Sequence, residues 1–157
     1  MAAKKGPLKT MGTAPDFTLR DQNGEELVLA DLRGRRVLLS FHPLAWTSIC
    51  AQQMQSLEAN LEAFESLNTV PLGISVDTVP SKKAWAESLG VKGLRMLSDF
   101  WPHGRVASLY SIFREKSGTS ERANVILDEN GKISFFKVYE TGQLPDIDEI
   151  IGVLKGL

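Results

Sequence analysis

A strand, a helix and a second strand in residues 36–75 constrain the fold more than any other feature of this sequence. The run Arg36–Phe41 carries an apolar block that suits a strand buried on both faces. From Cys50 onward the apolar residues change to helical spacing, and Val70–Ser75 then forms a second apolar run. The residues expected on one face of that helix are Cys50, Met54, Leu57, Leu61 and Phe64. Because such a unit joins parallel strands by a right-handed crossover, the segment predicts half of an α/β sheet.

Two hairpins and a closing helix flank this unit. Asn23-Gly24 and Asn130-Gly131 each separate two alternating or apolar runs, as a hairpin turn does. The other expected elements are helices at Ser81–Leu89 and Asp146–Leu154, a short strand at Leu94–Leu97 and a helical stretch at Ala107–Phe113. A βαβ half followed by a ββα half predicts a thioredoxin-like fold, with a central mixed sheet, flanking helices and an N-terminal β-hairpin.

Length and composition fit one globular domain over residues 1–157. The chain has 157 residues, of which 43% are hydrophobic and 24% charged, enough to bury a core without disulfides. Residues 1–13 carry little to bury and are expected to be a mobile tail. Lys4 and Lys5 precede no apolar stretch, so neither a signal peptide nor a membrane segment is expected. A single cysteine cannot form an internal disulfide, and the cytoplasm is the expected location.

The charge pattern argues against several classes of partner. The 18 basic and 19 acidic residues give a net charge of −1, without the basic patch that binds nucleic acid. The sequence also lacks a Cys/His cluster and a Gly-x-Gly-x-x-Gly loop. We therefore expect no metal, haem, flavin or nicotinamide cofactor, no nucleic acid and no membrane partner.

Cys50 is the candidate functional residue because it begins a helix directly after a buried parallel strand. Helix N-termini at this edge of an α/β sheet present free N–H groups to ligands, and they stabilise anions. Such a position favours the reactive thiolate form of a cysteine. The alternative is an inert core residue, because Cys50 shares its helical face with Met54 and Leu57 and free cysteines are often buried.

The residues before Cys50 favour the reactive interpretation. The segment Phe41–Cys50 contains the pattern Pro-x-x-x-Thr-x-x-Cys, which resembles the peroxidatic-cysteine motif of the peroxiredoxin family (AhpC/TSA type). The resemblance implies that Cys50 attacks the peroxide, that Thr47 reaches the sulfur or a peroxide oxygen, and that Pro43 shapes a shielding loop. Helix capping by Thr47 and turn formation by Pro43 are the simpler alternatives.

Arg122 is the fourth candidate. It immediately precedes the predicted strand Ala123–Leu127, which a thioredoxin-like sheet places antiparallel to Val37–Phe41, so Arg122 should lie near Cys50. Peroxiredoxins carry an arginine just before this strand, and the resemblance implies that it stabilises the thiolate and the leaving oxygen. A solvated surface arginine is the alternative.

Further segments resemble the same family, with some departures. Ala14–Leu19 resembles its opening, and Ser98–Gly104 resembles bacterial one-cysteine members related to alkyl hydroperoxide reductase E. Gln53 stands where many members carry glutamate, Gln55 stands where one subclass places a resolving cysteine, and His42 replaces an aromatic residue. The two histidines, His42 and His103, serve either in proton delivery or in ordinary packing.

The expected activity is thiol-dependent reduction of hydrogen peroxide and organic hydroperoxides. Without a second cysteine, a Cys50 sulfenic acid must be resolved by an external thiol, either a small molecule or a thioredoxin- or glutaredoxin-like protein. The main alternative is a peroxide sensor that passes the oxidation to a partner. A disulfide reductase is disfavoured because Thr47 and Gln53 replace the second cysteine of Cys-x-x-Cys. The family resemblance also suggests a homodimer, with Trp46, Phe100 and Trp101 available for contact.

Overall fold

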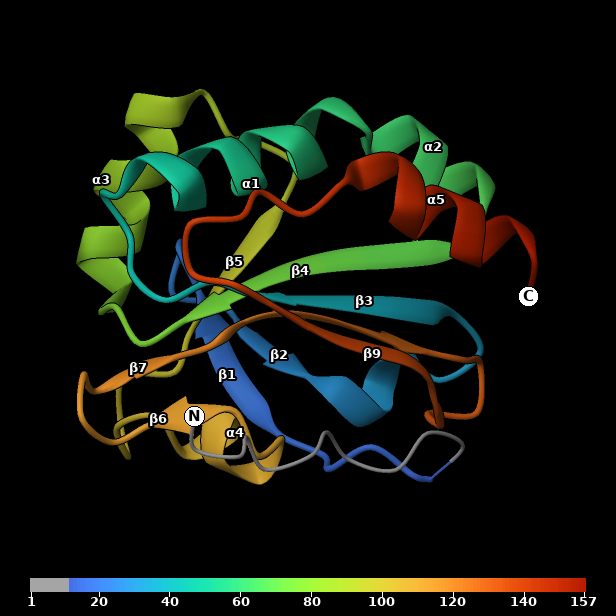
Figure 1. Cartoon of the computed structure of the whole chain (residues 1–157), viewed down its shortest axis with the longest axis horizontal. Coiled ribbons are helices and arrows are strands. Elements are labelled where there is room, and N and C mark those ends of the chain that lie inside the picture. The colour runs from blue at the N-terminus through green and yellow to red at the C-terminus, as the bar shows by residue number, and fades with distance from the viewer. Residues whose placement is uncertain (1–11) are drawn as a thin grey trace.

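The computed structural model describes residues 12–157, and it has the predicted α/β architecture (Figure 1). The strands of its main sheet are β1 (Thr18–Asp21), β2 (Glu26–Val28), β3 (Arg36–Phe41), β4 (Thr69–Ser75), β5 (Arg95–Ser98), β8 (Arg122–Leu127) and β9 (Ile133–Tyr139). Two short strands, β6 (Phe113–Arg114) and β7 (Thr119–Ser120), form a separate hairpin. The helices are the 3₁₀ helix η1 (Leu29–Leu32) and the α-helices α1 (Ser48–Ala59), α2 (Leu61–Ser66), α3 (Val79–Leu89), α4 (Arg105–Leu109) and α5 (Ile147–Lys155).

The sheet is mixed, and its topology brings distant segments to one edge. The strand order is β2-β1-β5-β4-β3-β8-β9. Strand β3 pairs in parallel with β4 and antiparallel with β8, with Phe41 opposite both Ile74 and Ala123. The predicted βαβ unit and the predicted antiparallel neighbour of β3 are thereby confirmed. The end of β3, the end of β4 and the start of β8 consequently meet at the same edge of the sheet.

Two apolar layers cover the two faces of the sheet. Helices α1, α2, α3 and α5 pack on one face, and helix α4 packs on the other (Figure 1). Successive side chains of β3 divide between the layers: Leu38 belongs to the layer of α1, whereas Val37 and Leu39 belong to the layer of α4. A strand that is buried on both sides explains the unbroken apolar run in its sequence.

The helix after β3 differs from its predicted form. It begins at Ser48, two residues before Cys50, and it ends at Ala59, with a second helix starting at Leu61. Asn60 leaves the helical region at φ −115° and ψ 19°, and its side-chain amide donates to the carbonyl of Ser56. An asparagine that bonds the backbone in this way competes with the regular helical hydrogen bonds, and this explains the interruption.

Two other boundaries also differ. The helical stretch predicted at Ala107–Phe113 is instead α4, which ends at Leu109, followed by Ser111 at a φ of 63° and strand β6. Most of the predicted tail, residues 1–11, lies outside the described residues. Its last two positions are held by the closing hairpin, because the amide of Ile133 donates to the carbonyl of Gly12 and Thr13 pairs with Lys132.

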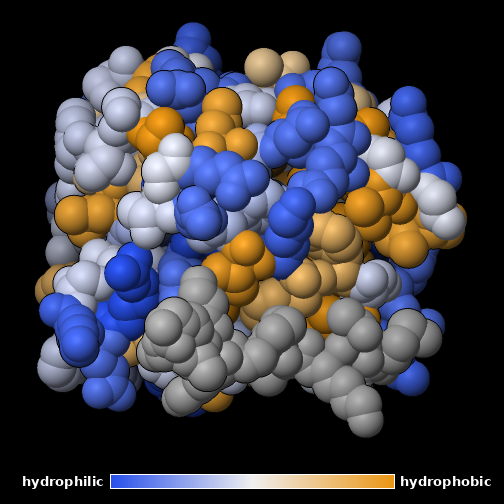
Figure 2. Space-filling view, viewed as in Figure 1, coloured by the Kyte–Doolittle hydropathy of each residue, from blue (hydrophilic) through white to orange (hydrophobic). Residues whose placement is uncertain are grey.

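The exposed edge of the sheet at β9 carries hydrophobic side chains. In Figure 2, hydrophobic side chains are visible over β9, whose residues are mostly half-buried because the strand forms one edge of the sheet. No helix in residues 12–157 is long and apolar enough to span a bilayer.

Candidate functional site

Cys50 is the third residue of α1 and is completely buried. Thr47 is the N-cap in extended conformation, and its carbonyl accepts the first intrahelical bond, from the amide of Ala51. The amides of the first turn precede that bond and have no partner within the helix. A partial positive charge therefore lies at the end of the helix that carries the sulfur.

Arg122 contacts the sulfur directly. Because Ala123 lies opposite Phe41, Arg122 sits just past the end of β3, and its Nη1 lies 3.3 Å from the Sγ of Cys50. The guanidinium is nearly buried, with an exposed fraction of 3%. Its Nε and Nη2 donate to the carbonyl of Thr141 at 3.1 and 2.7 Å. The position predicted for Arg122 is confirmed, and the alternative of a solvated surface arginine is wrong.

The charge of Arg122 has no carboxylate partner among the described residues. Its remaining contact is neutral, because Nη1 donates to the Oε1 of Gln53 at 2.7 Å. A buried cation without an anionic partner is costly, and an anion next to it is strongly stabilised. The sulfur of Cys50 is the atom in contact with this guanidinium that can carry a negative charge.

Gln53 is the site residue whose role the sequence did not reveal. It is buried one helical turn after Cys50, and its Nε2 donates to the Oγ of Ser40 at 2.7 Å and to the carbonyl of Phe41 at 3.2 Å. These bonds orient the amide so that its oxygen faces Arg122. The spacing of three residues from Cys50 was the available signal, since it places both side chains on one helical face.

Thr47 and Pro43 lie on the loop between β3 and α1. The Thr47 hydroxyl donates to the carbonyl of Leu44 at 2.9 Å and makes no capping bond, so helix capping by this side chain is wrong. Pro43 is half-buried at the start of the loop. The structure thus joins Cys50 and Arg122 in direct contact, and it places Thr47 and Pro43 on the loop that leads to the sulfur.

The two histidines have different surroundings. His42 is fully buried, with its ring 5.4 Å from the Trp85 ring and its Nε2 3.3 Å from the Nζ of Lys82. His103 is exposed, and its ring nitrogens lie 2.8 and 3.2 Å from the carbonyls of Gly118 and Phe100. His103 thus lies on the surface against two loop carbonyls, whereas His42 belongs to the buried surroundings of the site.

Within residues 12–157, no three side chains of the metal-ligating types His, Cys, Asp and Glu are grouped so that they could hold a metal ion. The groups gathered around Cys50 are instead an arginine, an amide and the helix N-terminus. This set stabilises negative charge on sulfur and on an oxygen bound beside it.

Comparison with known proteins identifies the family. The sequence model of the AhpC/TSA family matches residues 11–136, which include all four predicted site residues. The chain belongs to the AhpC/TSA family of peroxiredoxins. Members of this family are thiol-dependent peroxidases, which makes this chain a thiol-dependent peroxidase.

Individual peroxiredoxins resemble the chain over nearly its whole length. Alkyl hydroperoxide reductase E of Mycobacterium tuberculosis is 41% identical over 140 residues, covering 88% of this chain and 91% of the relative. Peroxiredoxin 2 of Thermoplasma acidophilum is 34% identical over 151 residues, covering 92% and 73% of the two chains. The crystal structure of reduced Plasmodium vivax 2-Cys peroxiredoxin aligns with a TM-score of 0.88 at 28% identity, covering 95% and 81%. The predicted thioredoxin-like fold is confirmed.

Proposed function

We propose that this peroxiredoxin reduces hydrogen peroxide and organic hydroperoxides by a one-cysteine mechanism in which Cys50 is the nucleophile. The observation that supports this proposal is the contact of 3.3 Å between the Cys50 sulfur and the Arg122 guanidinium, a buried cation with no carboxylate partner in the described part of the chain. This arrangement stabilises a thiolate, which is the nucleophilic form of cysteine.

The first step is a displacement at oxygen. The Cys50 thiolate attacks one oxygen of the hydroperoxide, an S–O bond forms and the O–O bond breaks. The electron pair of that bond goes to the leaving oxygen, which departs as water or an alcohol after taking up the hydroperoxide proton. The sulfur is thereby oxidised to a sulfenate, which takes up a proton from water to give sulfenic acid, and the peroxide is reduced. In this step Arg122 stabilises the charge that moves to the leaving oxygen.

The loop residues hold the substrate in this proposal. Thr47 lies at the N-cap of α1, where its hydroxyl donates a hydrogen bond to the carbonyl of Leu44. The hydroxyl oxygen can at the same time accept a hydrogen bond from the peroxide. Pro43 starts the loop and adds no backbone donor there. Orientation of the peroxide in line with the sulfur contributes to the rate along with the electrostatics.

The second step requires a thiol from outside the chain, since Cys50 is the single cysteine in the sequence. A thiol attacks the sulfenic sulfur, releasing water and forming a mixed disulfide, and a second thiol then restores Cys50 and leaves as the disulfide of the reductant. A small thiol or a thioredoxin- or glutaredoxin-like protein can serve. Because Cys50 is fully buried, a protein reductant can reach the sulfur only after the first turn of α1 moves.

We also propose that the protein acts in the cytoplasm and forms a homodimer. Trp46 and Trp101 are exposed by 57% and 79%, and they lie on loops that follow β3 and β5 at the edge of the sheet where Cys50 sits. Large exposed aromatic side chains are enriched in protein interfaces.

Steady-state peroxide consumption with excess dithiothreitol tests the proposal against a sensor that turns over once. We expect many turnovers for the native protein and none above background for Cys50→Ser, because the nucleophile is absent. Circular dichroism of the Cys50→Ser protein provides the control for folding. A single turnover per chain would support the sensor, and full activity of the variant would rule out Cys50 as the nucleophile.

A further inference from the structure

A second buried cation lies at the same edge of the sheet. Lys82 of α3 is completely buried, although it is one of two adjacent lysines on that helix. Its Nζ donates to the Oγ of Ser75 at 2.5 Å and lies 3.3 Å from the Nε2 of His42. The ammonium also lies 5.8 Å from the centre of the Trp85 ring. A buried lysine needs partners of this kind to remain charged.

The charge of Lys82 connects to one carboxylate through a hydroxyl. Ser75 accepts from Lys82 and donates its own proton to the Oδ2 of Asp77 at 2.6 Å. Burial lowers the pKa of Lys82 to about 8, while the negative charges of Asp77 and Cys50 act in the opposite direction. Lys82 therefore lies close enough to Cys50 for a positive charge on the ammonium to attract a negative charge on the sulfur.

His42 acts as the acceptor for this ammonium. Burial, followed by the positive charges of Lys82 and Arg122, holds the pKa of His42 well below its usual range. The neutral ring accepts at Nε2 and therefore carries its proton on Nδ1. That Nδ1 has no hydrogen-bond partner in the described part of the chain. His42 thus contacts Lys82 as a neutral ring and adds no further positive charge next to it.

The same network fixes the loop in front of the sulfur. The Oδ2 of Asp77 accepts from the amide of Ala45 at 2.8 Å, and the ring N–H of Trp46 donates to the Oγ of Ser81 at 3.0 Å. Trp46 has a φ of 72°, a left-handed conformation that is costly for a residue with a side chain. The contacts to Asp77 and Ser81 hold the loop at residues 43–47 in this conformation.

We infer that Lys82 is a positioning residue of the peroxidase site, which anchors loop 43–47 through Ser75 and Asp77 and supplies a second positive charge that acts on Cys50. The inference rests on the proposed function, in which the Cys50 thiolate attacks the peroxide. Arg122 acts by contact with the sulfur, whereas Lys82 acts through the network and through its field.

The test compares Lys82→Met with Lys83→Met. Lys83 is the adjacent residue on α3, with a largely exposed side chain 3.6 Å from Glu87, so its variant removes a charge from the surface of the same helix. The rate of Cys50 alkylation by iodoacetamide is measured against pH, and the second-order rate with hydrogen peroxide is measured by stopped flow. Lys82→Gln, which stays polar and can still bond Ser75, is measured as well, and it replaces Lys82→Met if that variant fails to fold.

We expect the pH midpoint of alkylation to rise by about one unit in both Lys82 variants, and the peroxide rate near neutral pH to fall by up to about tenfold because less of Cys50 is thiolate. Lys83→Met should match the native protein in both measurements. A purely structural role for Lys82 would leave the midpoint unchanged in the folded variants, and that result would overturn the inference. The alkylation profile does not depend on peroxide turnover. Failure of the native protein to consume peroxide would therefore count against the proposed function, while an unshifted midpoint would count against the role of Lys82.

Discussion

Two arginines open neighbouring strands of the sheet, and they differ in how their charge is balanced. Arg36 begins β3 and Arg122 begins β8, so the antiparallel pairing places them at opposite ends of the two strands. Arg36 lies 3.3 Å from Glu129 and donates to the carbonyls of Leu154 and Leu157. The guanidinium of Arg36 is therefore paired with the carboxylate of Glu129 and with two carbonyls near the C-terminus. These contacts join β3 to the C-terminal residues.

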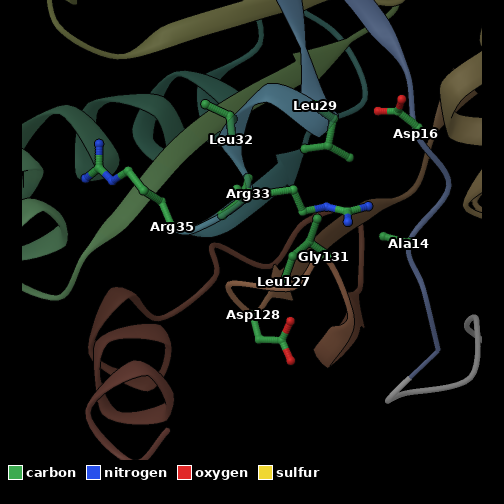
Figure 3. A pocket seen from close by; sticks show the side chains of 10 residues that line it. Ala14, Asp16, Leu29, Leu32, Arg33, Arg35, Leu127, Asp128 and Gly131 are labelled. Atoms are coloured by element: carbon green, nitrogen blue, oxygen red, sulfur yellow. The ribbon is translucent and has the colours of Figure 1, made fainter.

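Other charged groups near Arg36 also have partners of the opposite charge or backbone amides close by. The pocket in Figure 3 lies at this end of the sheet and is lined by arginines and by the carboxylates of Asp16 and Asp128. Asp16 accepts from the amide of Ala30, and Asp128 accepts from two amides of the β8–β9 turn. Charges of both signs are present there, and both carboxylates accept hydrogen bonds from backbone amides. At the other end, Arg122 has sulfur and neutral oxygens around it, and this difference marks the reactive end of the sheet.

Removing each of these two guanidinium groups should have very different effects on the peroxide rate. Arg122→Met should lower the second-order rate with hydrogen peroxide by roughly 100- to 1000-fold, because it removes the cation that stabilises the reacting charge. Arg36→Met should leave that rate within about twofold and lower the free energy of unfolding by about 1–2 kcal/mol. Stopped-flow kinetics and denaturant unfolding measure the two quantities. Equal rate losses in the two variants would contradict the distinction, and Arg122→Lys tests whether charge alone restores part of the rate.

A smaller effect comes from giving Arg122 the partner that Arg36 has. Gln53→Glu would place a carboxylate where Oε1 now lies 2.7 Å from the guanidinium, so less positive charge would act on the sulfur. We expect the peroxide rate to fall about tenfold at pH 7. Gln53→Met is the matched control, since it removes the hydrogen bond without adding a charge. A Gln53→Glu rate equal to that of the native protein would show that the missing carboxylate does not matter.

The smallest expected effect concerns stability at alkaline pH. Burial lowers the pKa of Lys82 from 10.5 to about 8, so between these values the unfolded chain holds a proton that the folded chain has lost. The free energy of unfolding should therefore rise with pH in this window, by about 1 kcal/mol between pH 8 and 9, and Lys82→Met should lack this rise. Urea titrations at the two pH values measure it. A rise of the same size in native protein and variant would assign it to other groups.

Much of the fold was predictable because its strands and helices carry strong local patterns. The buried strand at Arg36–Phe41 and the two Asn-Gly turns appear directly in the sequence. The β6–β7 hairpin was not predicted, because strands of two residues have no periodicity to detect. The helix break at Asn60 was also missed, because the apolar spacing continues across it while the backbone does not.

Some residues of the site were also predictable from the sequence, whereas the role of Lys82 was not. Cys50, Thr47 and Pro43 belong to one short motif, and the position of Arg122 followed from the register of two strands. The contacts of Lys82 join segments that are far apart in the sequence, so its partners could not be predicted from the residues around it. One signal was available: Lys82 precedes Trp85 and Leu89 by three and seven residues, so it lies on the apolar face of α3.

Ultraviolet absorbance at neutral pH measures the thiolate itself, and it therefore reports whether a negative sulfur balances the charge of Arg122. We expect thiolate absorbance in the native protein, none in Cys50→Ser and a strongly reduced signal in folded Arg122→Met. The same absorbance in the native protein and in Arg122→Met would contradict this expectation, since the cation in contact with the sulfur would then have no effect on its charge.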